Sequence, residues 1–146
     1  MTLNNTLIEL PTIIPDGEYC VQYLTYHTAY YRGIQKAPKV VVTFSVVDQK
    51  FKNTPLQRYY NVIRLDEPPG EKGDFSFGSK CDLYREYLNV FDSEANRKYI
   101  DWKLFEKYPV TAKVEKVTKD HEGRNIHRYA QYSIIKQLSK RDDLPF

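Results

Sequence analysis

The chain has 146 residues, with 22 Lys and Arg against 19 Asp and Glu, which gives a formal net charge of +3. This length fits one domain with its own core. Charged residues at 28% and the lack of a long apolar run exclude a membrane-spanning class, and 14% aromatic residues argue against disorder. Two cysteines, with no C-x-x-C pair and no signal-peptide pattern at the N-terminus, predict reduced thiols in a cytoplasmic protein.

The first half of the chain predicts mainly strands. Residues 1–15 end in prolines and indicate an irregular arm or an edge strand. Segments rich in Tyr, Val and Thr then predict three strands, at residues 18–32, 38–48 and 56–65. A Pro/Gly-rich loop follows at 66–78.

The second half predicts a helix and then a hairpin. Ser79 stands three residues before Asp82, the spacing of a capping box, and opens a helix over residues 79–92. Its apolar stripe consists of Leu83, Tyr84, Tyr87, Leu88 and Phe91. The segment 93–107 is compatible with a second short helix. Two further strands are expected at 109–119 and 126–138, and a mobile end follows them.

Three strands, a helix and two strands favour one fold class. It is an all-β OB-fold, a five-stranded Greek-key barrel with a helix between the third and fourth strands. An SH3-like barrel would lack the central helix, and a β-α-β-β-α-β fold would need a helix after the first strand. We therefore expect a single-stranded DNA-binding OB domain at residues 1–138 and a flexible acidic tail at 139–146.

The small net charge conceals an uneven distribution. Residues 18–64 hold 7 basic and 2 acidic residues, and residues 109–141 hold 8 basic and 3 acidic ones. Between them, residues 65–108 hold 7 basic and 10 acidic residues. The predicted sheet is therefore basic and the helical region acidic. A basic sheet with exposed rings suits a nucleic-acid single strand, because cations neutralise phosphates and bases stack on rings.

In an OB barrel the ligand crosses strands two and three, between the loops that join strands one to two and four to five. Both loops carry basic residues here, and Arg58, Tyr60 and Arg64 share one parity of the third strand. Since Tyr is also a common core residue, only some of the 13 tyrosines should touch a ligand. The predicted DNA-binding residues are Tyr30, Tyr31, Arg32, Lys36, Lys39, Arg58, Tyr60, Arg64, Lys113, Lys119, Arg124, Arg128 and Tyr129.

The chain ends Asp142-Asp143-Leu144-Pro145-Phe146. This end resembles the acidic tip of bacterial single-stranded DNA-binding proteins, where Asp residues precede an aliphatic residue, Pro and a terminal Phe. The resemblance implies that these five residues dock replication, repair and recombination enzymes. Phe146 would supply an aromatic anchor and a free carboxylate, and the two acids would meet a basic rim on the partner.

Two departures from that family stand out. The long Gly/Pro/Gln-rich linker is missing, and Lys140 and Arg141 directly precede the acids. We therefore expect a divergent phage, plasmid or mobile-element form, with the number of protomers left open. Its expected function is sequence-independent binding and protection of single-stranded DNA during replication, recombination or repair, without catalysis, cofactor or metal.

Two other function classes compete with this interpretation. A Tyr-rich barrel would also suit a protein–protein adaptor, and no residue pattern separates DNA from RNA as the ligand. A metal-dependent nuclease is the weakest alternative, because a bare D-x-K at Asp101-Trp102-Lys103 is common. Its partner carboxylates would come from Asp66, Glu67, Glu71 and Asp74.

Overall fold

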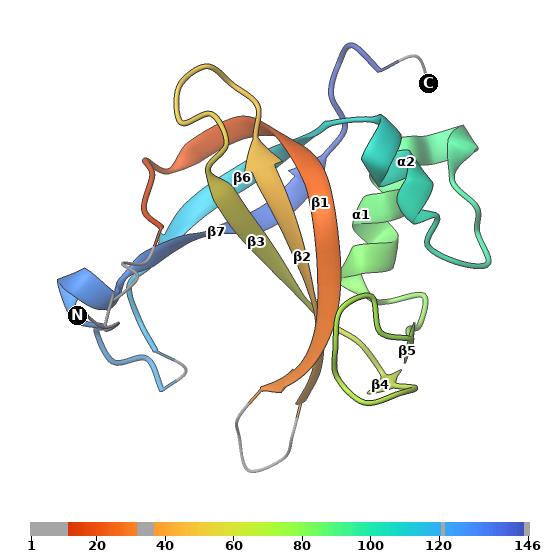
Figure 1. Cartoon of the computed structure of the whole chain (residues 1–146), viewed down its shortest axis with the longest axis horizontal. Helices are drawn as coiled ribbons and strands as arrows, with labels where there is room; N and C mark the ends of the chain where they lie inside the picture. Colours follow the sequence, from red (N-terminus) through yellow and green to blue (C-terminus); the bar gives the residue numbers. More distant parts are fainter. Residues whose placement is uncertain (1–11, 32–36, 121, 145–146) are drawn as a thin grey trace, which may run out of the picture.

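A computed structural model describes residues 12–31, 37–120 and 122–144 (Figure 1). Five strands form one antiparallel sheet in the order β3-β2-β1-β6-β7. Their bounds are β1 Gly17–Tyr31, β2 Ala37–Val46, β3 Pro55–Asn61, β6 Val110–Val117 and β7 Tyr132–Ser139. The outermost strands, β3 and β7, also contact each other, although no ladder joins them in the described part of the chain. The prediction of a mostly-β domain is thus confirmed.

The long strand β1 pairs with two neighbouring strands. Residues 17–21 pair with β6, and residues 21–31 pair with β2. The pairing with β2 shifts register between Tyr23 and Thr25, which marks a bulge. Because a bulge bends and twists its strand, β1 can curve from one half of the sheet into the other (Figure 1).

A short segment covers the edge of β1 that β6 leaves open. Residues 70–73, which we call the strap, lie within the loop between β4 (Arg64–Leu65) and β5 (Phe75–Ser76). The Thr28 amide donates to the Gly70 carbonyl at 2.9 Å, and the Lys72 amide donates to the Tyr26 carbonyl at 2.9 Å. A Cβ at Gly73 would stand 2.5 Å from the Thr28 hydroxyl oxygen, so the strap needs glycine there to approach β1 this closely.

The predicted helix is α1, Asp82–Phe91, followed by η1, Asp92–Glu94. The apolar stripe is confirmed, since Leu83, Tyr87 and Phe91 are buried. The capping box is wrong, because Cys81 is the N-cap and makes no side-chain cap hydrogen bond. The ambiguous segment 93–107 contains the short helix α2, Trp102–Lys107.

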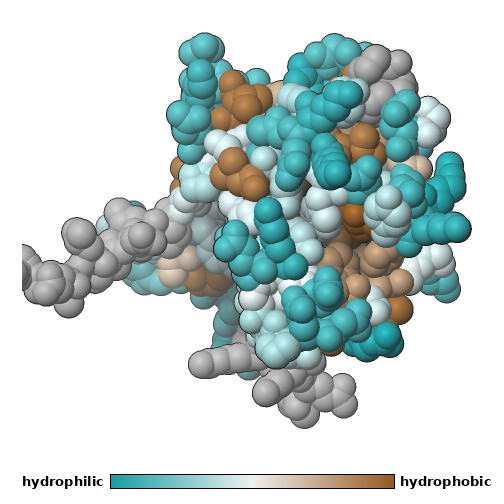
Figure 2. All heavy atoms as spheres, turned by 45° about the vertical axis from the view of Figure 1, so that its right-hand side comes forward, coloured by the Kyte–Doolittle hydropathy of each residue, from teal (hydrophilic) through white to brown (hydrophobic). Residues whose placement is uncertain are grey.

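The core lies between the sheet and these helices. The Trp102 ring of α2 stacks on Tyr26 of β1 at 4.3 Å, and Phe105 meets Phe91 edge-on at 4.8 Å. Seen from the helix side, hydrophilic side chains surround several separate apolar patches (Figure 2). Among the described residues, no helix is long and apolar enough to cross a membrane.

Two predicted strand boundaries are wrong. The third strand ends at Asn61 instead of Leu65, because the Ile63 amide bonds to the Ser76 carbonyl and so joins the β4–β5 hairpin. The last strand begins at Tyr132 instead of Ile126. The 3-10 helix η2, Arg128–Ala130, precedes it.

Candidate nucleic-acid interface

The two faces of β3 have different surroundings. Leu56 and Tyr60 are buried in the core, so the alternate residues Tyr59 and Asn61 point to the opposite, outer face. In register, Tyr59 lies beside Val41 of β2, and Val41 lies beside His27 of β1. These residues form a row across the outer face of the sheet.

The inner face of β3 holds a buried polar network. Glu86 of α1 accepts hydrogen bonds from the Tyr60 hydroxyl at 2.7 Å and from the Leu138 amide of β7 at 2.9 Å. It also pairs with the Arg58 guanidinium at 2.5 Å. One carboxylate therefore ties α1 to both outermost strands of the sheet.

This network corrects two predictions. Tyr60 is 1% exposed and presents no ring face to a ligand. Burial raises the pKa of its hydroxyl well above the ordinary value, and the Glu86 carboxylate raises it further. The Arg58 guanidinium lies 4.3 Å from the centre of the Tyr60 ring and forms an ion pair with Glu86. Neither residue belongs to a strand-binding surface.

Tyrosines converge on the outer face instead. The rings of Tyr31 and Tyr59 meet edge-on with their centroids 5.8 Å apart. Burial raises the pKa of both hydroxyls, and the nearby Tyr132 of β7 raises both further. We call Tyr31, Tyr59 and Tyr132 the tyrosine cluster. Val41 is 0% exposed although it lies outside the core cluster, so side chains of the outer face cover it.

The connection between β6 and β7 carries an exposed ring with a cation. Tyr129 is 65% exposed, and the Arg128 guanidinium lies 4.8 Å from its ring centre and donates to its hydroxyl at 2.7 Å. His127 packs against the same ring at 5.2 Å. Tyr129 stands on η2 rather than on the predicted fifth strand. Lys119 is exposed in the same connection.

The remaining predicted residues are spread over several elements. Tyr30 is exposed at the end of β1, and Lys39 of β2 contacts the Asn61 side chain. Three exposed cations have acidic neighbours: Arg64 with Asp66 at 2.8 Å, Lys113 with Glu115 at 3.5 Å, and Arg124 with Asp120 at 3.4 Å and Glu122. Exposed pairs contribute about 0–1 kcal/mol each, so a phosphate can replace the acid. Arg32, Lys36, Pro145 and Phe146 lie outside the described residues.

The described part of the tail folds back on the domain. Leu144 packs against the core, and its amide donates to the Arg141 carbonyl at 3.3 Å. Arg141 in turn pairs with Asp143 at 2.5 Å and donates to the Cys20 sulfur at 3.2 Å. The tail up to Leu144 thus adopts a turn beside Cys20 of β1, and Asp142 is exposed on it.

The D-x-K segment has a structural role. The Asp101 carboxylate accepts from the Lys103 amide at 3.1 Å and caps α2. In the described ranges, no three His, Cys, Asp or Glu side chains gather in a group that could hold a metal ion.

Sequence reasoning missed Tyr59 and Tyr132. The signal for Tyr59 was available in the alternation, because apolar Leu56 and Val62 share the parity of Tyr60 and mark that side as inward. Tyr132 carries no such signal, since only the packing of β7 near β3 brings it to the cluster. No family model, curated protein or solved structure matches this chain.

Proposed function

We propose that this protein is an OB-like single-stranded DNA-binding protein that coats strands without sequence preference. The observation that carries the proposal is the tyrosine cluster on the outer face of the sheet, where Tyr31 and Tyr59 meet at 5.8 Å. The strand order, with β3 and β7 in contact at the two ends, is compatible with an OB-like barrel.

The chemistry of this face suits bases and phosphates together. Every base has a ring face, and stacking on an aromatic side chain contributes roughly 1–3 kcal/mol per base. Tyr31 is partly exposed for such contacts on this face, and exposed rings elsewhere are Tyr30 at the end of β1 and Tyr129 with Arg128 beside it. Lys39 supplies a cation on the outer face of β2. Bound phosphates would release counterions from these cations.

The C-terminal five residues complete the proposal. They recruit replication, recombination and repair enzymes in the cytoplasm, through the acids and the terminal aromatic residue. The turn that holds Leu144 against the domain keeps this docking peptide close to the barrel. A recruited enzyme therefore works beside the coated strand.

Titration of a labelled oligothymidylate against a duplex of equal length, at two salt concentrations, tests strand binding. We expect tighter binding of the single strand and a steep loss of affinity with salt. Equal affinity for both forms, or no binding, would refute the proposal and favour a protein adaptor.

The docking role has its own experiment. A chain lacking Phe146 should bind oligothymidylate like the complete chain but retain no replication or repair enzyme on an affinity column. The matched control is Asp48→Asn, another single change at an exposed position. Equal retention by the truncated and complete chains would contradict the role of the tip.

A further inference from the structure

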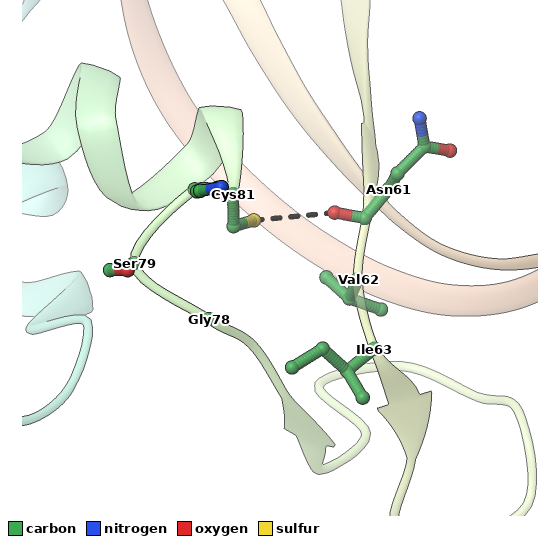
Figure 3. A pocket seen from close by; sticks show the side chains of 7 residues that line it. Asn61, Val62, Ile63, Gly78, Ser79 and Cys81 are labelled. Carbon is green, nitrogen blue, oxygen red and sulfur yellow. Dashed lines mark hydrogen bonds between the residues drawn. The ribbon is translucent and has the colours of Figure 1, made fainter.

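A cavity of about 370 Å³ opens at the end of β3. It lies between residues 61–63, which leave β3, and residues 78–81, which lead into α1 (Figure 3). Val62, Ile63 and Gly78 form apolar walls, and the Cys81 thiol, which donates to the Asn61 carbonyl at 3.2 Å, closes one end. This volume falls within the usual range of small-ligand pockets.

The cavity lies beside the end of β3, next to the outer face of the sheet. Asn61, which lines it, is two residues beyond Tyr59 on the same side of β3, a distance of about 7 Å along a strand. Lys39 contacts the Asn61 side chain from the neighbouring strand. A strand that stacks on Tyr59 therefore reaches the cavity with an adjacent nucleotide.

We propose that this cavity receives one nucleobase of the bound single strand. The inference rests on the proposed function and adds to it a site for one base. Apolar Val62 and Ile63, whose side chains point toward the segment that carries Gly78, would contact the ring faces, and the Cys81 thiol lies at the end of the cavity (Figure 3). Lys80 at the rim and Lys39 beside it match the charge of the flanking phosphates.

Filling the cavity is the first test. A Cβ on Gly78 would touch the Ile63 side chain at 3.4 Å without strain from a positive φ, so Gly78→Leu places its side chain in the cavity. Gly70→Leu is the matched control, because a Cβ there meets nothing within 4 Å. We expect Gly78→Leu to weaken oligothymidylate binding about tenfold, the equivalent of one lost base contact. Gly70→Leu should stay within about twofold of the natural chain.

Protection of Cys81 is the second test and needs no variant. Both cysteines of the natural chain are alkylated with iodoacetamide and followed by peptide mass spectrometry. When oligothymidylate saturates the protein, alkylation of Cys81 should slow at least fivefold, about the effect of 1 kcal/mol of protection. Cys20, which bonds to Arg141 on another side of the domain, is the internal reference and should not change. This readout decides the matter if Gly78→Leu fails to fold.

The outcomes separate the two proposals. No binding of oligothymidylate by the natural chain overturns the proposed function. Normal binding with unchanged Cys81 alkylation, or with equal affinities for Gly78→Leu and Gly70→Leu, overturns the base site alone. Slower Cys81 alkylation together with a Gly78-specific loss of affinity supports it.

Discussion

Both faces of β3 carry a tyrosine, but one face is turned toward the core and the other is turned outward. On the inner face, Arg58 and Tyr60 converge on the Glu86 carboxylate, where Tyr60 and Glu86 are buried and Arg58 is half-buried. On the outer face, one residue away, Tyr59 meets Tyr31 and lies in the row with Val41. A Tyr or Arg in a strand is therefore no sign of a ligand surface until its face is known.

The difference also separates stability from binding. The inner network joins three elements through a largely buried carboxylate, so losing one member leaves a partly buried charge unpaired. The outer tyrosines Tyr31 and Tyr59 contact each other nearer the surface, so losing Tyr59 removes a ring and its hydrogen bond to Gln57 but leaves no buried charge unpaired. Substitutions on the two faces should therefore have separable effects.

The largest effect is expected on the inner face. Glu86→Ala leaves Arg58 charged and without its carboxylate, and it removes the acceptor of the Tyr60 hydroxyl and the Leu138 amide. We expect a loss of about 3–5 kcal/mol in the free energy of unfolding, measured in urea. Glu94→Ala in η1 is the exposed control and should change it by less than about 0.5 kcal/mol. A small effect of Glu86→Ala would mean that the network does not join the strands.

One substitution on each face of β3 tests which face binds DNA. Tyr59→Ala should weaken oligothymidylate binding by roughly 1–3 kcal/mol, because it removes a stacking ring. Tyr60→Phe should leave that affinity unchanged and lower only the unfolding free energy, by about 1.5–3 kcal/mol for the lost hydrogen bond to a carboxylate. Fluorescence titration and urea unfolding measure the two quantities. If Tyr60→Phe weakened oligothymidylate binding and Tyr59→Ala did not, the binding surface would lie on the Tyr60 face of β3.

A smaller effect on binding is expected from removing an exposed cation of the β6–β7 connection. Arg128→Ala should reduce the slope of log affinity against log salt by about 1, because an exposed guanidinium beside Tyr129 can neutralise one phosphate. Lys103→Ala, an exposed change on α2, should leave the slope as it is. Equal slopes for both variants would remove the β6–β7 connection from the proposed interface.

The stability of the fold should also depend on pH. Burial raises the pKa of Tyr23 to about 12, and it also raises the pKa of Tyr59 and Tyr60 above the ordinary 10.0. Since the folded chain holds these protons more tightly, their contribution to stability is complete below about pH 9 and is lost as the pH rises toward 12. Urea midpoints at increasing pH should fall in that window. Tyr60→Phe should lessen the decline, whereas an unchanged decline would assign it to other groups.

Much of the fold could be predicted from the sequence. The five strands of the main sheet and the helix with its stripe of Leu83, Tyr87 and Phe91 follow from local periodicity. The short β4–β5 pair was not predicted, and β5 lies in the segment that was expected to be a loop. The strand ends could not, because they depend on distant partners: Ile63 leaves β3 to bond with Ser76, thirteen residues later in the chain. The cap of α1 also escaped prediction, since Ser79 has the right spacing but stands outside the helix.

The candidate site was predicted less well for a related reason. Tyr30, Tyr31, Arg128 and Tyr129 lie at exposed ends and connections, where burial does not decide their role. Arg58 and Tyr60 were assigned to the wrong face because a buried carboxylate from a helix can neutralise an inward arginine, and nothing near them in sequence shows that Glu86 does so. Whether these side chains are buried or exposed depends on residues that are distant in the sequence.

The strap has a consequence for self-association. An unpaired strand edge displays amide and carbonyl groups that can template pairing with another chain. Residues 70–73 pair with these groups at Tyr26 and Thr28 of β1, through the amides of Thr28 and Lys72. These two hydrogen bonds hinder the pairing of another chain with this part of the edge. This part of β1 is thus a poor template for β-aggregation between copies of the chain.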